Sequence, residues 1–164
     1  WVYRELYTQK ITADIFAKKV LDLESGEYIR YGVLDASTWA RRGDIGPSIA
    51  ETMIQAGCRW RPSDRTGRSR ISGKLEIHKR LKVEDKEPGI RIFSNCRNLL
   101  RTFPTLPLDD SNPEDINTHV EDHAYDALRY GCMSRPMHTS YANKAFGNSN
   151  RTANFVPSDK IFGY

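Results

Sequence analysis

The stretch T-H-V-E-D-H-A-Y-D-A-L-R-Y, residues Thr118 to Tyr130, has its polar side chains at helical spacing. At about 100° per residue, one face of such a helix carries the metal-capable side chains His119, Asp122, His123 and Asp126. Thr118 and Glu121 have the spacing of a capping box, which predicts that the helix begins at Thr118. The cluster indicates a metal or catalytic site; the alternative is a solvated acidic first turn with two ordinary surface histidines.

The composition of the chain places limits on its class. With 164 residues, a formal charge of +4 and a mean hydropathy of -0.64, we expect one domain that has no membrane span. Cys58, Cys96 and Cys132 lie far apart and form no C-x-x-C pair, which argues against a disulfide framework or a cysteine zinc site and favours a reducing cytoplasm. Because the chain opens on Trp1, we expect it to be a fragment of a longer protein.

A basic run occupies the middle of the chain, between Arg59 and Lys82. We interpret six of its side chains as candidate contacts to a DNA backbone: Arg65, Arg68, Arg70, Lys74, Lys79 and Arg80. The alternative is a solvated helix and loop, since basic runs are common on protein surfaces.

Strand and helix patterns alternate along the chain, which predicts an α/β domain whose sheet is covered by helices. The expected strands are Trp1–Tyr7, Tyr28–Leu34, Cys58–Arg61 and Gly89–Phe93. The expected helices are Thr12–Leu23, Pro47–Gly57, a segment with the apolar stripe Ile71, Leu75, His78 and Leu81, and Asn95–Phe103. We expect His78 to serve packing rather than chemistry. Residues 137–164 are polar, with isolated aromatics, and predict an irregular or mobile tail.

Asp35 follows the strand that ends at Leu34, a position where open α/β sheets build their sites. A helix that carries Asp122, His123 and Asp126 could face it. Carboxylate oxygens brought together in this way could bind two divalent ions for phosphodiester hydrolysis. The alternative for Asp35 alone is a turn-forming aspartate that binds its own backbone.

Several of these segments together resemble the C-terminal nuclease domain of the large terminase subunit of tailed bacteriophages, which has a ribonuclease-H-like fold. The likeness covers residues 1–136 and rests on R-E-L-Y, I-T-A-D-I-F-A-K-K-V, Y-G-V-L-D-A-S and, most specifically, E-D-H-A-Y-D-A-L-R-Y. It implies that Asp35 and Asp126 hold Mg²⁺ or Mn²⁺ in a two-metal site. It further implies that Asp122 is an additional metal ligand and that His123 takes part in catalysis.

The resemblance implies an endonuclease that cuts concatemeric viral double-stranded DNA during genome packaging in the host cell cytoplasm. Its partners would be DNA, the portal protein and the small terminase subunit, and the isolated domain would be a monomer without membrane contact. The family's first metal-binding aspartate lies on an opening strand that has no match here, so we expect a mixed sheet without its opening strand and an impaired enzyme.

Two other functions stay open. The chain could be a catalytically incomplete fragment that binds DNA or the portal, for which the basic run and the polar tail would suffice. His119 and His123, four residues apart, also suggest a zinc hydrolase, although H-V-E-D-H lacks the glutamate that H-E-x-x-H places second. Divalent metal binding separates the nuclease from the inactive fragment.

Overall fold

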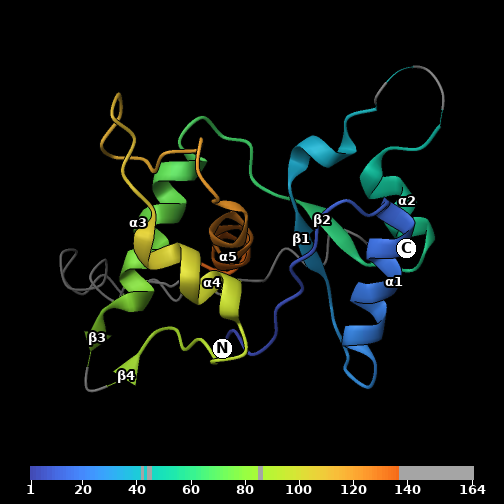
Figure 1. Ribbon diagram of the computed structural model, residues 1–164, viewed down its shortest axis with the longest axis horizontal. Helices are drawn as coiled ribbons and strands as arrows, with labels where there is room; N and C mark the ends of the chain where they lie inside the picture. The colour runs from blue at the N-terminus through green and yellow to red at the C-terminus, as the bar shows by residue number, and fades with distance from the viewer. Residues whose placement is uncertain (42, 44–45, 85–86, 137–164) are drawn as a thin grey trace, which may run out of the picture.

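The computed structural model of the protein describes residues 1–136 except 42, 44, 45, 85 and 86 (Figure 1). In chain order its helices and strands are α1 (Ala13–Glu24), β1 (Gly32–Leu34), η1 (Ala36–Trp39), α2 (Ile49–Gln55), β2 (Trp60–Pro62), α3 (Ser69–Leu81), β3 (Val83–Glu84), β4 (Glu87–Pro88), α4 (Arg97–Thr102), η2 (Phe103–Thr105) and α5 (His123–Ser134). The expected α/β class is confirmed at this coarse level, with a small parallel sheet among several helices. The predicted polar tail, residues 137–164, lies outside the described residues.

The parallel sheet has two strands, β1 and β2, with Val33 opposite Arg61. Successive side chains of a strand point to opposite faces. Leu34 therefore packs with α1 and α2, whereas Val33 lines a groove beside α5. In Figure 1, α1 and α2 lie on one side of the sheet and α3, α4 and α5 on the other. β3 and β4 form a separate antiparallel pair.

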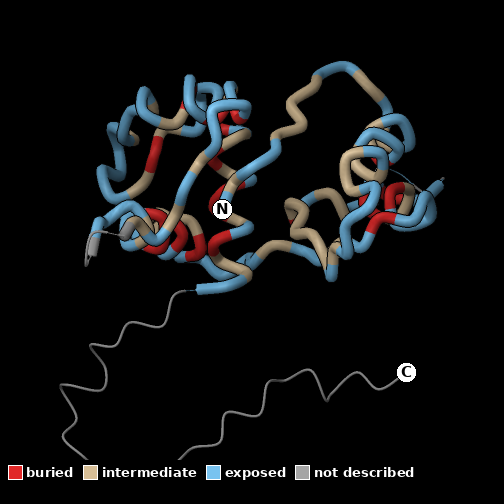
Figure 2. Tube along the Cα trace, turned by 90° about the horizontal axis from the view of Figure 1, so that it is seen from below, coloured by how far each residue is buried: buried red, intermediate tan, exposed pale blue. Residues whose placement is uncertain are grey.

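Two apolar cores stabilise these two sides, and Figure 2 shows the buried residues in two groups. The smaller core joins α1, α2 and the sheet through Ala17, Met53 and Cys58. The larger core lies among α3, α4 and α5, and its buried members are Ile77, Cys96, Leu99, Ile116, Tyr125, Leu128 and Cys132. On α2, Met53 is buried whereas Ile54 is 43% exposed, because this short helix turns only one narrow face inward.

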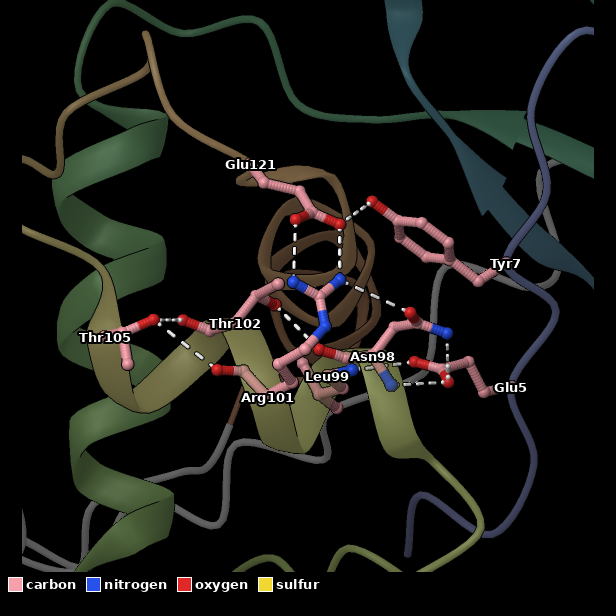
Figure 3. Close-up of polar contacts among 8 residues, drawn as sticks. All are labelled: Glu5, Tyr7, Asn98, Leu99, Arg101, Thr102, Thr105 and Glu121. Carbon is pink, nitrogen blue, oxygen red and sulfur yellow. Dashed lines mark hydrogen bonds and ion pairs between the residues drawn. The ribbon is translucent and has the colours of Figure 1, made fainter.

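The opening segment is extended, but it is not the strand predicted over Trp1–Tyr7. It makes one isolated parallel bridge, between Val2 and Ile92, and then runs past the first turn of α4. Glu5 accepts hydrogen bonds from the backbone N–H groups of Asn98 and Leu99, at 2.9 and 2.8 Å, in the first turn of α4 (Figure 3). A carboxylate is stabilised there by unpaired N–H groups and the helix dipole. These contacts anchor the segment without a sheet.

The prediction that the last helix begins at Thr118 is wrong, because α5 begins at His123. Glu121 makes no capping box with Thr118. Its carboxylate instead accepts hydrogen bonds from Arg101, at 2.6 and 2.9 Å, and from the Tyr7 hydroxyl at 2.6 Å (Figure 3). Hydrogen bonds from Arg101 and then Tyr7 lower the pKa of Glu121 to about 2. His119 therefore lies outside the helix. The zinc-hydrolase hypothesis required His119 and His123 to lie one turn apart on a helix, and α5 does not place them so.

The apolar stripe predicted for α3 is also wrong. Leu75 is 55% exposed and His78 is exposed, whereas Gly73, Glu76 and Ile77 are buried. α3 presents this face because Gly73 allows it to approach α5: a Cβ atom at Gly73 would lie 2.4 Å from Cγ of Arg129. Close contact at a small residue thus outweighs the apolar pattern.

A cleft of about 880 Å³ separates α1 from α5. Its walls include Phe16, Val20 and Leu23 of α1 and Ala124 and Leu128 of α5, and the opening segment also lines it. Within the part of the chain that the structure describes, no helix is long and apolar enough to span a membrane.

The contact between α3 and α5 predicts opposite effects for two glycine substitutions. Gly73→Ala should lower the free energy of unfolding by about 1–3 kcal/mol, because the added methyl group overlaps the buried Arg129 side chain. Gly131→Ala, on α5, should raise it by about 0.5–1 kcal/mol, because a Cβ atom there meets nothing within 4 Å and alanine favours a helix. Urea denaturation of both variants measures the difference, and equal effects would contradict this packing.

Candidate active site at the end of β1

Asp35 lies directly after β1. It forms a turn with the residues that follow it, and its side chain is on the face of the sheet that is turned towards α5. Its Oδ1 atom accepts a hydrogen bond from the Ser37 N–H at 2.6 Å and caps η1. Its Oδ2 atom accepts a hydrogen bond from the Tyr130 hydroxyl at 2.5 Å. Asp35 therefore does form a turn through Oδ1, as the alternative interpretation expected, while Oδ2 is directed to Tyr130 of α5.

Tyr130 brings the predicted carboxylates together. Its hydroxyl oxygen lies 2.5 Å from Oδ2 of Asp35 and 3.5 Å from Oδ2 of Asp126, so these two carboxylate oxygens are no farther apart than the sum of those distances. The sequence reasoning missed Tyr130. Its position four residues after Asp126 was the available signal, because such residues share a helix face.

Asp126 is fixed by a buried arginine on the same helix. Its Oδ1 atom accepts a hydrogen bond from Nε of Arg129 at 3.0 Å and forms an ion pair with Nη2 of the same side chain at 2.9 Å. The Arg129 side chain is only 5% exposed, and its guanidinium lies 4.6 Å from the centre of the Tyr130 ring. One oxygen of Asp126 is thus committed to Arg129, while the other is directed towards Tyr130 and Asp35.

Burial and hydrogen bonding act in opposite directions on Asp35. Burial alone would raise its pKa, but hydrogen bonds from Tyr130 and Ser37 and the charge of Arg129 outweigh burial, so the pKa of Asp35 lies below its usual value. The pKa of Tyr130 is raised, first by burial and then by its hydrogen bond to Asp35. At neutral pH the pair is therefore an ionised carboxylate and a neutral hydroxyl donor.

Asp122 and His123 lie at the start of α5, one turn before Asp126. Asp122 is 7% exposed, and burial, followed by repulsion from Asp126, raises its pKa. The His123 side chain is 81% exposed, and its Nδ1 atom lies 3.6 Å from Oδ1 of Asp122. His123 lines the cleft between α1 and α5 rather than the groove beside β1. Its catalytic role stays a prediction.

The capacity of the site for metal is limited. Among residues 1–136, with the five omitted positions set aside, no group of three or more His, Cys, Asp or Glu side chains is arranged to hold an ion. Oxygens bound to one Mg²⁺ lie about 3–4 Å apart, whereas the Tyr130 hydroxyl lies between the Oδ2 atoms of Asp35 and Asp126, so sharing an ion would require the two carboxylates to approach each other. The proposed roles of Asp35, Asp126 and Asp122 as metal ligands stay predictions.

The candidate DNA-binding side chains have varied surroundings. Several bind other parts of the protein: Arg65 the Ala36 carbonyl, Arg70 the Asp115 carboxylate, Lys74 the carbonyls of Pro113 and Glu114, and Arg80 the Glu76 carboxylate and the Cys132 and Arg135 carbonyls. Arg68 and Lys79 are exposed. Their DNA-binding role stays a prediction, and the fold uses four of the six to tie loops together.

Comparisons with protein-family models, curated proteins and solved structures gave no match to this chain. Functional inference therefore depends on the geometry of the site.

The ion pair of Asp126 and Arg129 predicts that the two site aspartates differ in their effect on stability. Asp126→Ala should destabilise the fold by about 3 kcal/mol or more, because it leaves the buried Arg129 guanidinium without its carboxylate. Asp35→Asn should cost less than about 1 kcal/mol, because asparagine also caps a helical turn. Thermal and urea unfolding measure both; similar losses would argue against the buried pair.

The raised pKa of Asp122 predicts a pH-dependent gain in stability on substitution. The folded chain holds this proton to higher pH than the unfolded chain, so the ionised carboxylate weakens the fold once the pH passes the folded pKa. Asp122→Asn should then stabilise the protein at pH 7, and this gain should vanish as the pH falls below the pKa of an aspartate in the unfolded chain, about 3.9. The exposed Asp110→Asn is the matched control, in which urea unfolding should show no such trend.

Proposed function

We propose that this protein is a divalent-metal-dependent DNA endonuclease domain of the large terminase type, with a ribonuclease-H-like arrangement, that cuts concatemeric viral double-stranded DNA during packaging. The observation that supports this most is the meeting of Asp35, from a strand end, and Asp126, from a helix, at the Tyr130 hydroxyl. Hard divalent cations bind carboxylate oxygens, and this meeting brings two carboxylates together.

In this proposal Asp35 and Asp126 would hold Mg²⁺ or Mn²⁺ through their Oδ2 atoms. When bound, the metal activates water and stabilises charge on the phosphate oxygens. Asp35 is ready for this role because its pKa is lowered, so it is ionised at neutral pH. Arg129 fixes Asp126 by binding its other oxygen, and Tyr130 keeps the two carboxylates aligned by donating a hydrogen bond to Asp35.

The number of carboxylates limits how well this site would work. Two divalent ions carry four positive charges, whereas Asp35 and Asp126 supply two negative charges and Asp122 a third. The pKa of Asp122 is raised first by burial and then by repulsion from Asp126, and a bound cation would reduce that repulsion. We therefore infer one weak ion site and slow, non-specific nicking by this chain alone, with a stronger site if an upstream segment supplies a further aspartate.

The alternative function is a catalytically incomplete piece that binds DNA or the portal protein. It is favoured by the lack of a group of three metal-capable side chains among the described residues. Metal binding separates the two functions.

Calorimetric titration with MnCl₂ tests the proposed metal site directly. The parent chain should bind one Mn²⁺ in the millimolar range, by the charge count of oxygen sites, and Asp35→Asn should lose this binding while remaining folded. Asp64→Asn is the matched control, since Asp64 is exposed and its carboxylate is occupied by Thr66 in a turn.

Plasmid nicking in Mn²⁺ should follow the same order among the three proteins. A parent chain that binds no Mn²⁺ would favour the incomplete fragment, and vigorous cleavage that survives Asp35→Asn would exclude this site.

A further inference from the structure

A groove of about 330 Å³ runs between the sheet and α5, and it is lined by side chains from both. Tyr130, whose hydroxyl contacts Asp35 and Asp126, lines it together with Arg129. Tyr31, Val33 and Arg61 line it from the sheet side, where Val33 lies opposite Arg61. Because Tyr31, Val33 and Asp35 are every second residue of one extended segment, their side chains lie on the same face, which is turned towards α5.

Two guanidinium groups converge on the ring of Tyr31. The Cζ atom of Arg61 lies 4.3 Å from the ring centre and that of Arg135 5.8 Å, and Nε of Arg135 donates a hydrogen bond to the Tyr31 hydroxyl at 3.3 Å. Both arginines are exposed, and neither pairs with a carboxylate in the described part of the chain. The hydrogen bond from Arg135 lowers the pKa of Tyr31, against the opposing effect of burial. The cluster is therefore an exposed concentration of positive charge on a fixed aromatic ring.

One carboxylate also lines the groove, that of Asp64. Its two oxygens accept hydrogen bonds from the N–H and hydroxyl of Thr66, at 2.9 and 3.0 Å. It therefore belongs to a local turn, and Arg61 and Arg135 supply two positive charges beside this one negative charge.

The distance between the Tyr31 cluster and the carboxylate pair fits a nucleic-acid strand. From Tyr31 to Asp35 the extended chain spans about 13 Å. Phosphates of one strand of a DNA duplex advance by about 3.4 Å per nucleotide along its axis, so this span corresponds to about four nucleotides. Arginine binds phosphate oxygens through parallel N–H groups, and such contacts position the backbone without reading the bases.

We propose that Tyr31, Arg61 and Arg135 form a phosphate-binding subsite that holds a DNA strand about four nucleotides from the Asp35–Asp126 pair. This inference takes DNA as the ligand from the proposed function. The subsite would hold the backbone along the groove, so that a phosphodiester bond lies beside the carboxylates.

The test is fluorescence anisotropy with a labelled DNA duplex in EDTA, from 50 to 200 mM salt. Replacing both residues, Arg61→Ala and Arg135→Ala, should weaken binding at least tenfold at 50 mM salt. It should also reduce the slope of log affinity against log salt by about 2, since each lost phosphate contact removes about 0.9 from that slope.

The matched control removes two charges elsewhere, by Lys18→Ala and Lys19→Ala on the exposed side of α1, across the sheet from the groove. This pair should leave the slope almost unchanged. The double lysine variant, Arg61→Lys with Arg135→Lys, should keep most of the slope, which separates lost charge from a lost fold. An unchanged slope in the alanine pair, or an equal decrease in the α1 control, would overturn the subsite.

Metal binding and DNA binding are measured separately, so the two proposals can fail separately. Loss of DNA binding in the alanine pair, in a parent chain that binds no Mn²⁺, would keep the subsite and remove the nuclease. Mn²⁺ binding that Asp35→Asn abolishes, with an unchanged salt slope in the alanine pair, would keep the metal site and remove the phosphate-binding subsite.

Discussion

The buried ion pair between Asp126 and Arg129 is the interaction on which the arrangement of this molecule depends. A guanidinium that is 5% exposed requires a partner, and Asp126 supplies it from the preceding turn of the same helix. Gly73 gives α3 room to pack on the Arg129 side chain, and Tyr130 follows directly with its hydroxyl directed at Asp35. The contacts that hold α3 and α5 together therefore also set the position of the site.

The two-stranded sheet is held in place mainly by the helices that pack on it. β1 and β2 have three residues each, and a short parallel pair has little stability of its own. In their register, Gly32 and Leu34 bond to β2, so the N–H and C=O groups of Val33 point to the other edge, where no strand of the described chain pairs. Packing of helices on both faces therefore keeps Asp35 in place.

Local signals in the sequence predicted local structure, and distant partners overturned the rest. Gly57 follows the end of α2, as expected, with a φ of 111°. This turn could be predicted because it depends only on the ability of glycine to adopt a positive φ. Glu121 had the spacing of a capping box, but Arg101 and Tyr7 bind its carboxylate, so α5 begins later. The meeting of Asp35 with Asp126 followed from their positions at a strand end and on a helix face, whereas Tyr130 was overlooked.

The carboxylate pair and the Tyr31 cluster have complementary charge requirements. Asp35 and Asp126 are too few to neutralise two divalent ions, and ions held by few carboxylates usually take their remaining oxygens from water and from substrate phosphate. A DNA strand held at Arg61 and Arg135 would bring such oxygens to the carboxylates. On this reasoning metal and DNA would each increase the affinity of the other, since coupling between two sites is reciprocal. A weak metal site would then be filled chiefly when DNA lies in the groove.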